Sequence, residues 1–278
     1  MLIKNLEEEL GALLFERTSR GVEPTLAGRR LYTHAVAMLR QAEEAKGEIK
    51  ALSGTVAGPL RVGLMPTFTR GLLAPVLSAY LTDFPEVELS VVEAYSGVLV
   101  AKVAAGELDL AVVPHAGDRD DLRSRPLGSD REVLVCRPGG SLPHLAPVRL
   151  AELPSLKLVL PARGNARRDR LDMLFHTMSL PVAAILDMDA MIATLDFVAS
   201  SDWVTILPQT ICGKDLDGRL RRLHPIMGPE LTVGYAVIEA ARHATSPAAA
   251  RFLERLEAEY ARSQATWDRA LGSGYQSS

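Results

Sequence analysis

Residues 6–28 read LEEELGALLFERTSRGVEPTLAG, and this stretch decides the fold of the N-terminal part of the chain. Ile3, Leu6 and Leu10 fall on one face of a predicted helix. Gly11 follows at the position where helices commonly end, because glycine adopts the left-handed backbone conformation without strain. The pattern therefore predicts a short amphipathic helix that ends at Gly11.

The residues after this helix predict a wing, that is, a β-hairpin beside a helix. Leu14 and Phe15 are expected to return the chain to a core. The segment 17–21 has the composition of a turn, and Thr25 can cap the N-terminus of a following helix. The order of helix, hairpin and helix start is that of the second half of a winged helix-turn-helix.

In this order and spacing, the motifs resemble those of the LysR-type transcriptional regulators. The resemblance implies that residues 1–25 are an incomplete winged helix-turn-helix that starts inside the recognition helix, so we expect about two more helices before Met1. Four arginines lie between residues 17 and 30 against the single Glu23, although the net charge of the whole chain is −3. This basic patch suits DNA phosphates, with a solvated surface as the alternative. The expected contacts to double-stranded operator DNA are Lys4, Arg17, Arg20 and Thr25.

Residues 26–57 predict a long helix followed by a hinge. Apolar residues recur at alternating steps of four and three, which is the heptad pattern of a helix that pairs with another helix. The chain's own domain is the alternative cover for this stripe. The resemblance implies a linker helix that joins subunits into a homodimer or homotetramer. The seam consists of Leu31, Ala35, Met38, Ala42, Ala45, Ile49 and Leu52.

Residues 58–265 alternate between strand and helix patterns, which is typical of an α/β domain with helices on the faces of a parallel sheet. The resemblance implies an effector-binding domain of two subdomains, similar to type II periplasmic binding proteins. We place the two chain crossings near Asp130 and Ile238. Subdomain I then comprises about 60–130 and 238–262, subdomain II about 131–237, and residues 266–278 form a tail.

Composition and motifs argue against several other functions. The 278 residues are 47% hydrophobic, and no apolar run is long enough to span a bilayer. Cys136 and Cys212 form no metal or redox pattern and favour a reducing, cytoplasmic compartment. The six histidines lack metal-ligand spacing and no cofactor fingerprint occurs, so neither a metal, a cofactor nor an enzyme is expected. Asp187 and Asp189 could act as an acid–base pair, but they more readily end a strand or cap a helix.

The predicted ligand site lies beyond the carboxyl ends of the strands, where ligands bind in open parallel sheets. Helix N-termini there favour anions, and an arginine can add a forked donor. The resemblance places Thr67 and Ser96 at effector-contact positions, with simple helix capping as the alternative for both. Solvent exposure is the alternative for Arg163 and Asn165. We expect a small organic acid to be bound by Thr67, Ser96, His115, Arg163 and Asn165.

Two classes of function remain at this point. The first is a ligand-responsive, DNA-binding transcription regulator. The second is a solute-binding protein of similar architecture that delivers a small ligand to a transporter. A protein of the second class needs an export signal, and its function involves neither a wing nor a heptad helix.

Overall fold

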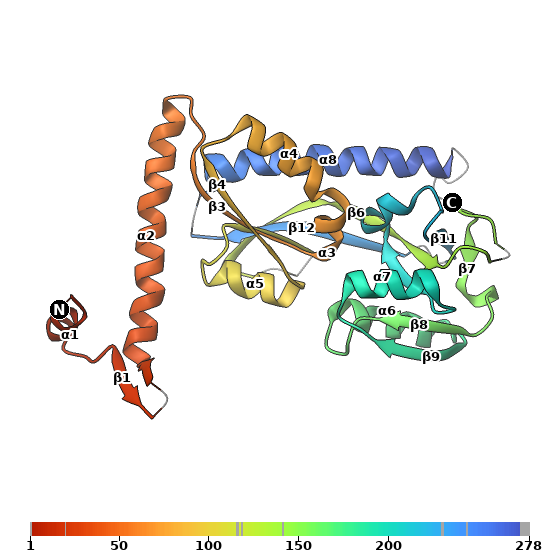
Figure 1. Cartoon of the computed structure of the whole chain (residues 1–278), viewed down its shortest axis with the longest axis horizontal. Coiled ribbons are helices and arrows are strands. Elements are labelled where there is room, and N and C mark those ends of the chain that lie inside the picture. Colours follow the sequence, from red (N-terminus) through yellow and green to blue (C-terminus); the bar gives the residue numbers. More distant parts are fainter. Residues whose placement is uncertain are drawn as a thin grey trace.

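In the computed structural model, a small N-terminal unit, a long helix and a two-lobed α/β domain follow one another along the chain (Figure 1). Among the described residues, no helix combines the length and apolarity needed to cross a membrane. The structure describes residues 2–19, 21–114, 117, 119–140, 142–228, 231–242 and 244–272.

The N-terminal unit contains the predicted helix and hairpin. Helix α1 (Leu2–Leu10) ends at Gly11, whose φ of 63° is left-handed. Strands β1 (Phe15–Thr18) and β2 (Gly21–Pro24) pair antiparallel. Leu14 is buried, but Phe15 is 42% exposed, so its predicted place in a core is wrong. Neighbouring residues of an extended chain point to opposite sides, so only one of the two can face inward.

The long helix α2 (Leu26–Leu52) follows directly and stands apart from the α/β domain over much of its length (Figure 1). Thr25 caps it as predicted: its hydroxyl accepts a hydrogen bond from Gly28 N at 3.1 Å. The helix ends before Gly54, whose φ is 85°. Strand β3 (Gly58–Leu64) then begins at the first residue of the predicted α/β segment 58–265.

Subdomain I is built on strands in the order β4-β3-β5-β12-β6. The first three pair in parallel, as the β-α-β-α-β pattern predicted, whereas β12 and β6 run antiparallel to their neighbours. Helices α4 and α8 cover one face of the sheet and α5 covers the other (Figure 1). The remaining elements of this subdomain are α3 (Pro66–Phe68), the π-helical turn η1 (Thr69–Leu73), α4 (Ala74–Asp83), β4 (Val87–Glu93), α5 (Ser96–Ala104), β5 (Leu110–Pro114), β6 (Leu122–Cys136), β12 (Thr232–Ala240) and α8 (Pro247–Leu271).

Subdomain II gathers around the second half of β6, which pairs with β10 and β11. Strands β8 and β9 form a parallel pair beside it, and the bridge between Leu158 and Val204 joins the pair to β10. Its elements are β7 (Val148–Arg149), the 3₁₀ turn η2 (Leu150–Glu152), β8 (Leu156–Leu160), α6 (Ala166–Thr177), β9 (Val182–Asp187), α7 (Met191–Ser200), β10 (Thr205–Pro208), the 3₁₀ turn η3 (Gln209–Asp215) and β11 (Arg222–Met227).

The chain passes between the subdomains along β6, which pairs with β12 up to Arg131 and with β10 from Glu132 onward. This crossing lies at the predicted place, near Asp130. The return crossing differs from the prediction near Ile238, because β12 pairs with β6 of subdomain I from its first residue, Thr232. The return therefore precedes β12.

Helix α8 also differs from the prediction. It continues to Leu271, so residues 266–271 are helical and the prediction of a tail from residue 266 is wrong. The physical reason is Trp267, a fully buried side chain that packs in the core of subdomain II. Phe252 and Leu256, earlier on the same helix, pack in the core of subdomain I. Helix α8 thus spans both cores.

Candidate functional site

A cleft of about 370 Å³ lies between the two subdomains, and we call it the interlobe cleft. It is lined where strands of both subdomains end. Pro66 follows β3 and Pro114 ends β5, while Pro161 follows β8 and Pro208 ends β10. The cleft therefore occupies the sheet edge at which the sequence predicted a ligand site.

Four helices begin at the wall of the interlobe cleft. The first residues of α3, α5, α6 and α7 all line it, and these are Pro66, Ser96, Ala166 and Met191. The first turn of a helix has unpaired N–H groups and a partial positive charge, so the convergence of four such ends favours an anion.

Thr67 and Ser96 are both brought to the interlobe cleft. Neither α3 nor α5 has a side-chain cap, so these hydroxyls do not serve the simple capping role that was the alternative. Tyr95 lines the cleft beside them, and burial together with the nearby carboxylates of Asp189 and Glu93 raises the pKa of its phenol. Tyr95 is therefore a neutral hydroxyl at physiological pH.

Asn165 also lines the interlobe cleft, and it caps α6 by accepting a hydrogen bond from Arg167 N at 3.0 Å. The Arg167 side chain lies in the cleft and was missed by sequence reasoning. Its Nη2 donates to the Ile206 carbonyl and lies 3.4 Å from Glu132 Oε1. Its Nε is buried without a hydrogen-bond partner among the described residues. The capping asparagine was the available signal, since a cap places the next residues in a helix's first turn.

Arg163 does not reach the interlobe cleft. It is exposed and lies on a separate surface hollow with Arg168, Phe175 and His176. The loop residue thus faces outward, while Arg167 in the first turn of α6 lines the interlobe cleft. His115, the fifth expected contact, lies outside the described residues.

Asp187 and Asp189 have structural partners, in keeping with the interpretation that the sequence favoured. Asp187 pairs with buried Arg168, and Asp189 Oδ1 accepts a hydrogen bond from Ala162 N at 3.1 Å. In the part of the chain that the structure describes, no group of three histidine, cysteine or acidic side chains is arranged to hold a metal ion.

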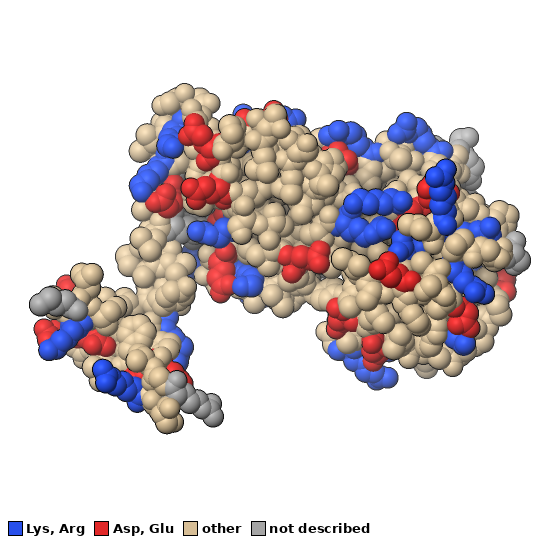
Figure 2. Space-filling model, viewed as in Figure 1, with Lys and Arg blue, Asp and Glu red and all other residues tan. Residues whose placement is uncertain are grey.

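The expected DNA contacts differ in how free their side chains are. Lys4 is largely exposed and 3.8 Å from Glu8, and Arg17 is exposed on β1. Thr25 is fully engaged instead, because its hydroxyl also donates to the Leu13 carbonyl at 2.6 Å. Arg20 lies outside the described residues. Charges of both signs are interspersed over the face seen in Figure 2, including the N-terminal unit.

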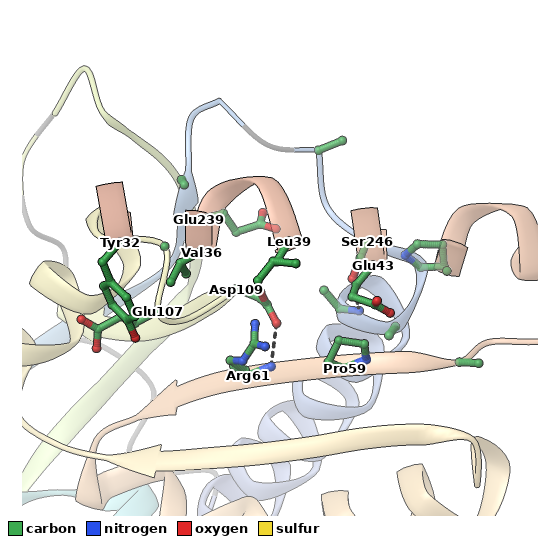
Figure 3. A pocket seen from close by; sticks show the side chains of 18 residues that line it. Tyr32, Val36, Leu39, Glu43, Pro59, Arg61, Glu107, Asp109, Glu239 and Ser246 are labelled. Atoms are coloured by element: carbon green, nitrogen blue, oxygen red, sulfur yellow. Dashed lines mark hydrogen bonds between the residues drawn. The ribbon is translucent and has the colours of Figure 1, made fainter. Parts of the chain in front are cut away.

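A second pocket, of about 380 Å³, lies between α2 and subdomain I (Figure 3). Tyr32, Val36 and Leu39 line it from α2, and Arg61 and Asp109 line it from the sheet. Asp109 directly precedes β5, between the apolar residues Leu108 and Leu110. Its Oδ2 accepts a hydrogen bond from Arg61 N at 2.6 Å, which explains why a polar residue stands at this position.

The predicted heptad seam occupies a neighbouring stripe of α2. Met38, Ile49 and Leu52 are 62%, 67% and 89% exposed, and none of the seam residues lines the pocket. Four residues of α2 that line the pocket are one position later in the sequence than a seam residue, or about 100° around the helix; they are Tyr32, Val36, Leu39 and Glu43. Leu31 and Ala35 are half-buried, whereas the seam from Met38 onward is left exposed by the chain's own domain.

The fold and the site together define a class of protein: a two-lobed ligand-binding domain joined by a long helix to a winged helical motif. Residues 53–261 match the family described as the LysR substrate binding domain. Residues 1–29 match the bacterial regulatory helix-turn-helix protein family, lysR type. The chain belongs to the LysR family of transcriptional regulators.

Individual relatives agree with this assignment. The nitrogen assimilation regulatory protein nac of Klebsiella aerogenes is 31% identical over 256 residues, which are 89% of this chain and 80% of that protein. A full-length OxyR variant from Pseudomonas aeruginosa has the same fold, with a TM-score of 0.68, 23% identity, and coverage of 92% and 82% of the two chains. Full-length CbnR in complex with its target DNA has a TM-score of 0.59 at 22% identity, covering 92% and 87%.

Proposed function

We propose that this regulator responds to a small organic anion bound in the interlobe cleft. The observation that carries the proposal is the convergence of four helix N-termini, the hydroxyls of Thr67 and Ser96, and the guanidinium of Arg167 on one cleft. Fixed N–H dipoles and a forked cation stabilise a carboxylate better than they stabilise a neutral group. Asn165 supports the site by holding the start of α6.

We infer that binding of the anion in the cleft changes the arrangement of the two subdomains. It lies between two subdomains that are connected by β6, by the return segment before β12 and by α8, so a ligand that contacts both favours a closed arrangement. A switch requires the ligand to bind one arrangement more tightly than the other. Subdomain I follows α2 directly, so closure would alter the angle between α2 and subdomain II.

The test is a thermal-shift screen of small organic acids against the full chain and the double variant Thr67→Val/Ser96→Ala. We expect an acid that stabilises the wild type to bind the variant roughly tenfold or more weakly, because hydrogen bonds to a charged group are lost. Equal stabilisation of both proteins would place the effector elsewhere. Arg163→Gln is the matched control, since Arg163 lies outside the cleft.

The proposal extends to DNA and to assembly. Lys4, Arg17 and Arg20 are the proposed contacts to operator phosphates, supported by the helix-turn-helix match over residues 1–29. The seam from Leu31 to Leu52 is proposed to pair two chains. The helix-turn-helix match and the seam argue against the alternative of a solute-binding protein, because such a protein needs neither feature. We infer a cytoplasmic regulator that binds its effector without chemically converting it.

A further inference from the structure

The position of Glu132 bears on the charge that an effector can have, and this inference rests on the proposed function. The residue lies on β6 where the strand enters subdomain II, and its side chain is 3% exposed while lining the interlobe cleft. Its backbone is held on both sides: Glu132 pairs with Pro208 of β10, and its N–H donates to the Leu231 carbonyl at 2.7 Å. The carboxylate is therefore a fixed part of the cleft wall.

The charges that line the cleft can be counted. Among the described lining residues, the acidic and basic side chains are Glu132, Arg167 and Arg170. Two basic side chains and one acidic side chain give the lining residues a net charge of +1, while the carboxylates of Asp189 and Glu93 lie near Tyr95 but outside the lining. Tyr95 adds nothing to this sum, since its raised pKa keeps the phenol neutral.

The two arginines are already engaged. Arg167 Nη2 serves both Glu132 and the Ile206 carbonyl, and Arg170 donates to the Thr232 carbonyl. One negative charge on a ligand would balance the remaining positive charge of the wall. A second negative charge would have no cation of its own and would be repelled by Glu132, because like charges interact strongly where water is largely excluded.

We propose that Glu132 determines specificity by restricting the interlobe cleft to singly charged anions, the monocarboxylate class, and rejecting dianions of similar size. The carboxylate acts through repulsion, which is how specific sites commonly exclude a close analogue.

The experiment uses acids matched in carbon number: propanoate with malonate, butanoate with succinate, pentanoate with glutarate, and 2-methylbenzoate with phthalate. Each is titrated calorimetrically into the full chain at neutral pH and constant ionic strength, with pentanamide as a neutral probe. The variant is Glu132→Gln, which keeps the shape and removes the charge. Glu152→Gln is the matched control, because Glu152 is 73% exposed, outside the cleft, and 3.7 Å from Arg149.

We expect the monocarboxylate of each binding pair to bind wild type at least tenfold more tightly than its dicarboxylate. Glu132→Gln should reduce this ratio to about one or invert it, and Glu152→Gln should leave it unchanged. A dicarboxylate that binds wild type as tightly as its partner overturns the proposal, as does an unchanged ratio in folded Glu132→Gln.

A second measurement needs no variant. Monomethyl glutarate carries one negative charge at neutral pH where glutarate carries two, so it should bind wild type more tightly than glutarate, and equal binding of the two contradicts the role of charge. The proposed function fails in a different way: either no carboxylate binds, or pentanamide binds as tightly as pentanoate. Those outcomes remove the anion site itself, whereas tight dianion binding removes only the restriction to a single charge.

Discussion

At Gly28, the first turn of α2 passes directly against the backbone of Leu14. A Cβ atom added to Gly28 would lie 2.0 Å from the Leu14 carbonyl oxygen, a distance that requires the backbone to move. The same carbonyl accepts a hydrogen bond from Thr25 N at 2.9 Å, so the contact holds the hairpin to the helix. Gly47, later in α2, has more room: its added Cβ would meet only the Ala57 carbonyl oxygen, at 3.4 Å.

These two glycines therefore predict opposite effects of the same substitution. Gly28→Ala should destabilise the N-terminal unit by about 1–3 kcal/mol, the usual cost of overpacking. Gly47→Ala should stabilise α2 by about 0.5–1 kcal/mol, because alanine loses less backbone entropy in a helix. Hydrogen exchange of the amides in α2 measures both. Equal protection in the two variants would show that the Leu14 contact does not constrain the helix.

Asp130 is a buried carboxylate at the crossing between the subdomains. It accepts hydrogen bonds from Thr210 Oγ1 at 2.8 Å, Tyr260 OH at 3.0 Å and Gln264 Nε2 at 2.7 Å. Burial nevertheless raises the pKa of Asp130, because these hydrogen bonds offset only part of the lost hydration. The folded state thus binds the proton of this carboxyl more tightly than the unfolded state.

The sign of the resulting pH dependence follows from linkage. A raised folded pKa contributes stability that is present below the unfolded pKa and is lost as pH rises through the folded pKa. We expect the stability of wild type relative to Asp130→Asn to fall as pH rises above the ordinary aspartate range of about 4. Urea unfolding of both proteins across a pH series measures this difference. A relative stability that rises with pH would contradict the raised pKa.

Helix α2 shows how one element can carry two surfaces. One stripe, including Tyr32 and Val36, faces subdomain I across the pocket of Figure 3. The seam with Met38 and Ile49 faces away and is exposed in the single chain. An exposed apolar stripe of this length is typical of a helix that pairs with another helix.

Met38→Glu should therefore weaken the assembly of chains, because pairing would bury a charge without a partner. Gln41→Glu is the control, since it adds the same charge at an exposed position of α2 outside the seam. Light scattering across a dilution series should give a lower mass for Met38→Glu than for Gln41→Glu or wild type, with tetramers falling to dimers if the effector domains also associate. Identical masses at every concentration would refute pairing through the seam.

At the scale of the whole molecule, helix α8 and one ion pair connect the two subdomains. Helix α8 contributes Phe252 to one core and Trp267 to the other. Arg70 of η1 forms an ion pair with buried Asp215 of η3 at 2.8 Å, and this pair also links the subdomains. Arg221 pairs with the same carboxylate at 2.7 Å, so Asp215 keeps a counterion if the subdomains move and Arg70 withdraws.

Trp267 gives this arrangement a measurable consequence. Trp267→Ala should destabilise the protein by about 3–5 kcal/mol, the usual cost of removing a large buried aromatic side chain. Trp267→Phe should cost much less, because it refills most of the volume and Trp267 Nε1 has no hydrogen-bond partner among the described residues. Urea unfolding measures both variants. Similar stability for Trp267→Ala and wild type would show that the end of α8 does not support subdomain II.

Much of this protein follows from short-range patterns in its sequence. The cap at Thr25, the glycine that ends α1, the hairpin, the span of α2 and the first three parallel strands depend on residues close together in the chain, and each was predicted. Thr67, Ser96 and Asn165 line the interlobe cleft for a similar reason, since the ends of parallel strands meet at one edge of a sheet, and their contact with an effector stays a prediction.

Only the tertiary structure decided the features that depend on distant partners. Strand β6 contains Pro126 and Gly128, which favour turns, yet it remains extended because β12 pairs with it along a ladder that has an irregularity at Tyr235. Arg167 rather than Arg163 lines the interlobe cleft, because the cap of α6 orients its first turn. Local sequence signals where an element begins and ends. Local sequence does not signal which buried surfaces or opposite charges from the rest of the chain will contact an element. Those contacts set the length of β6, the end of α8 and the charge of the cleft.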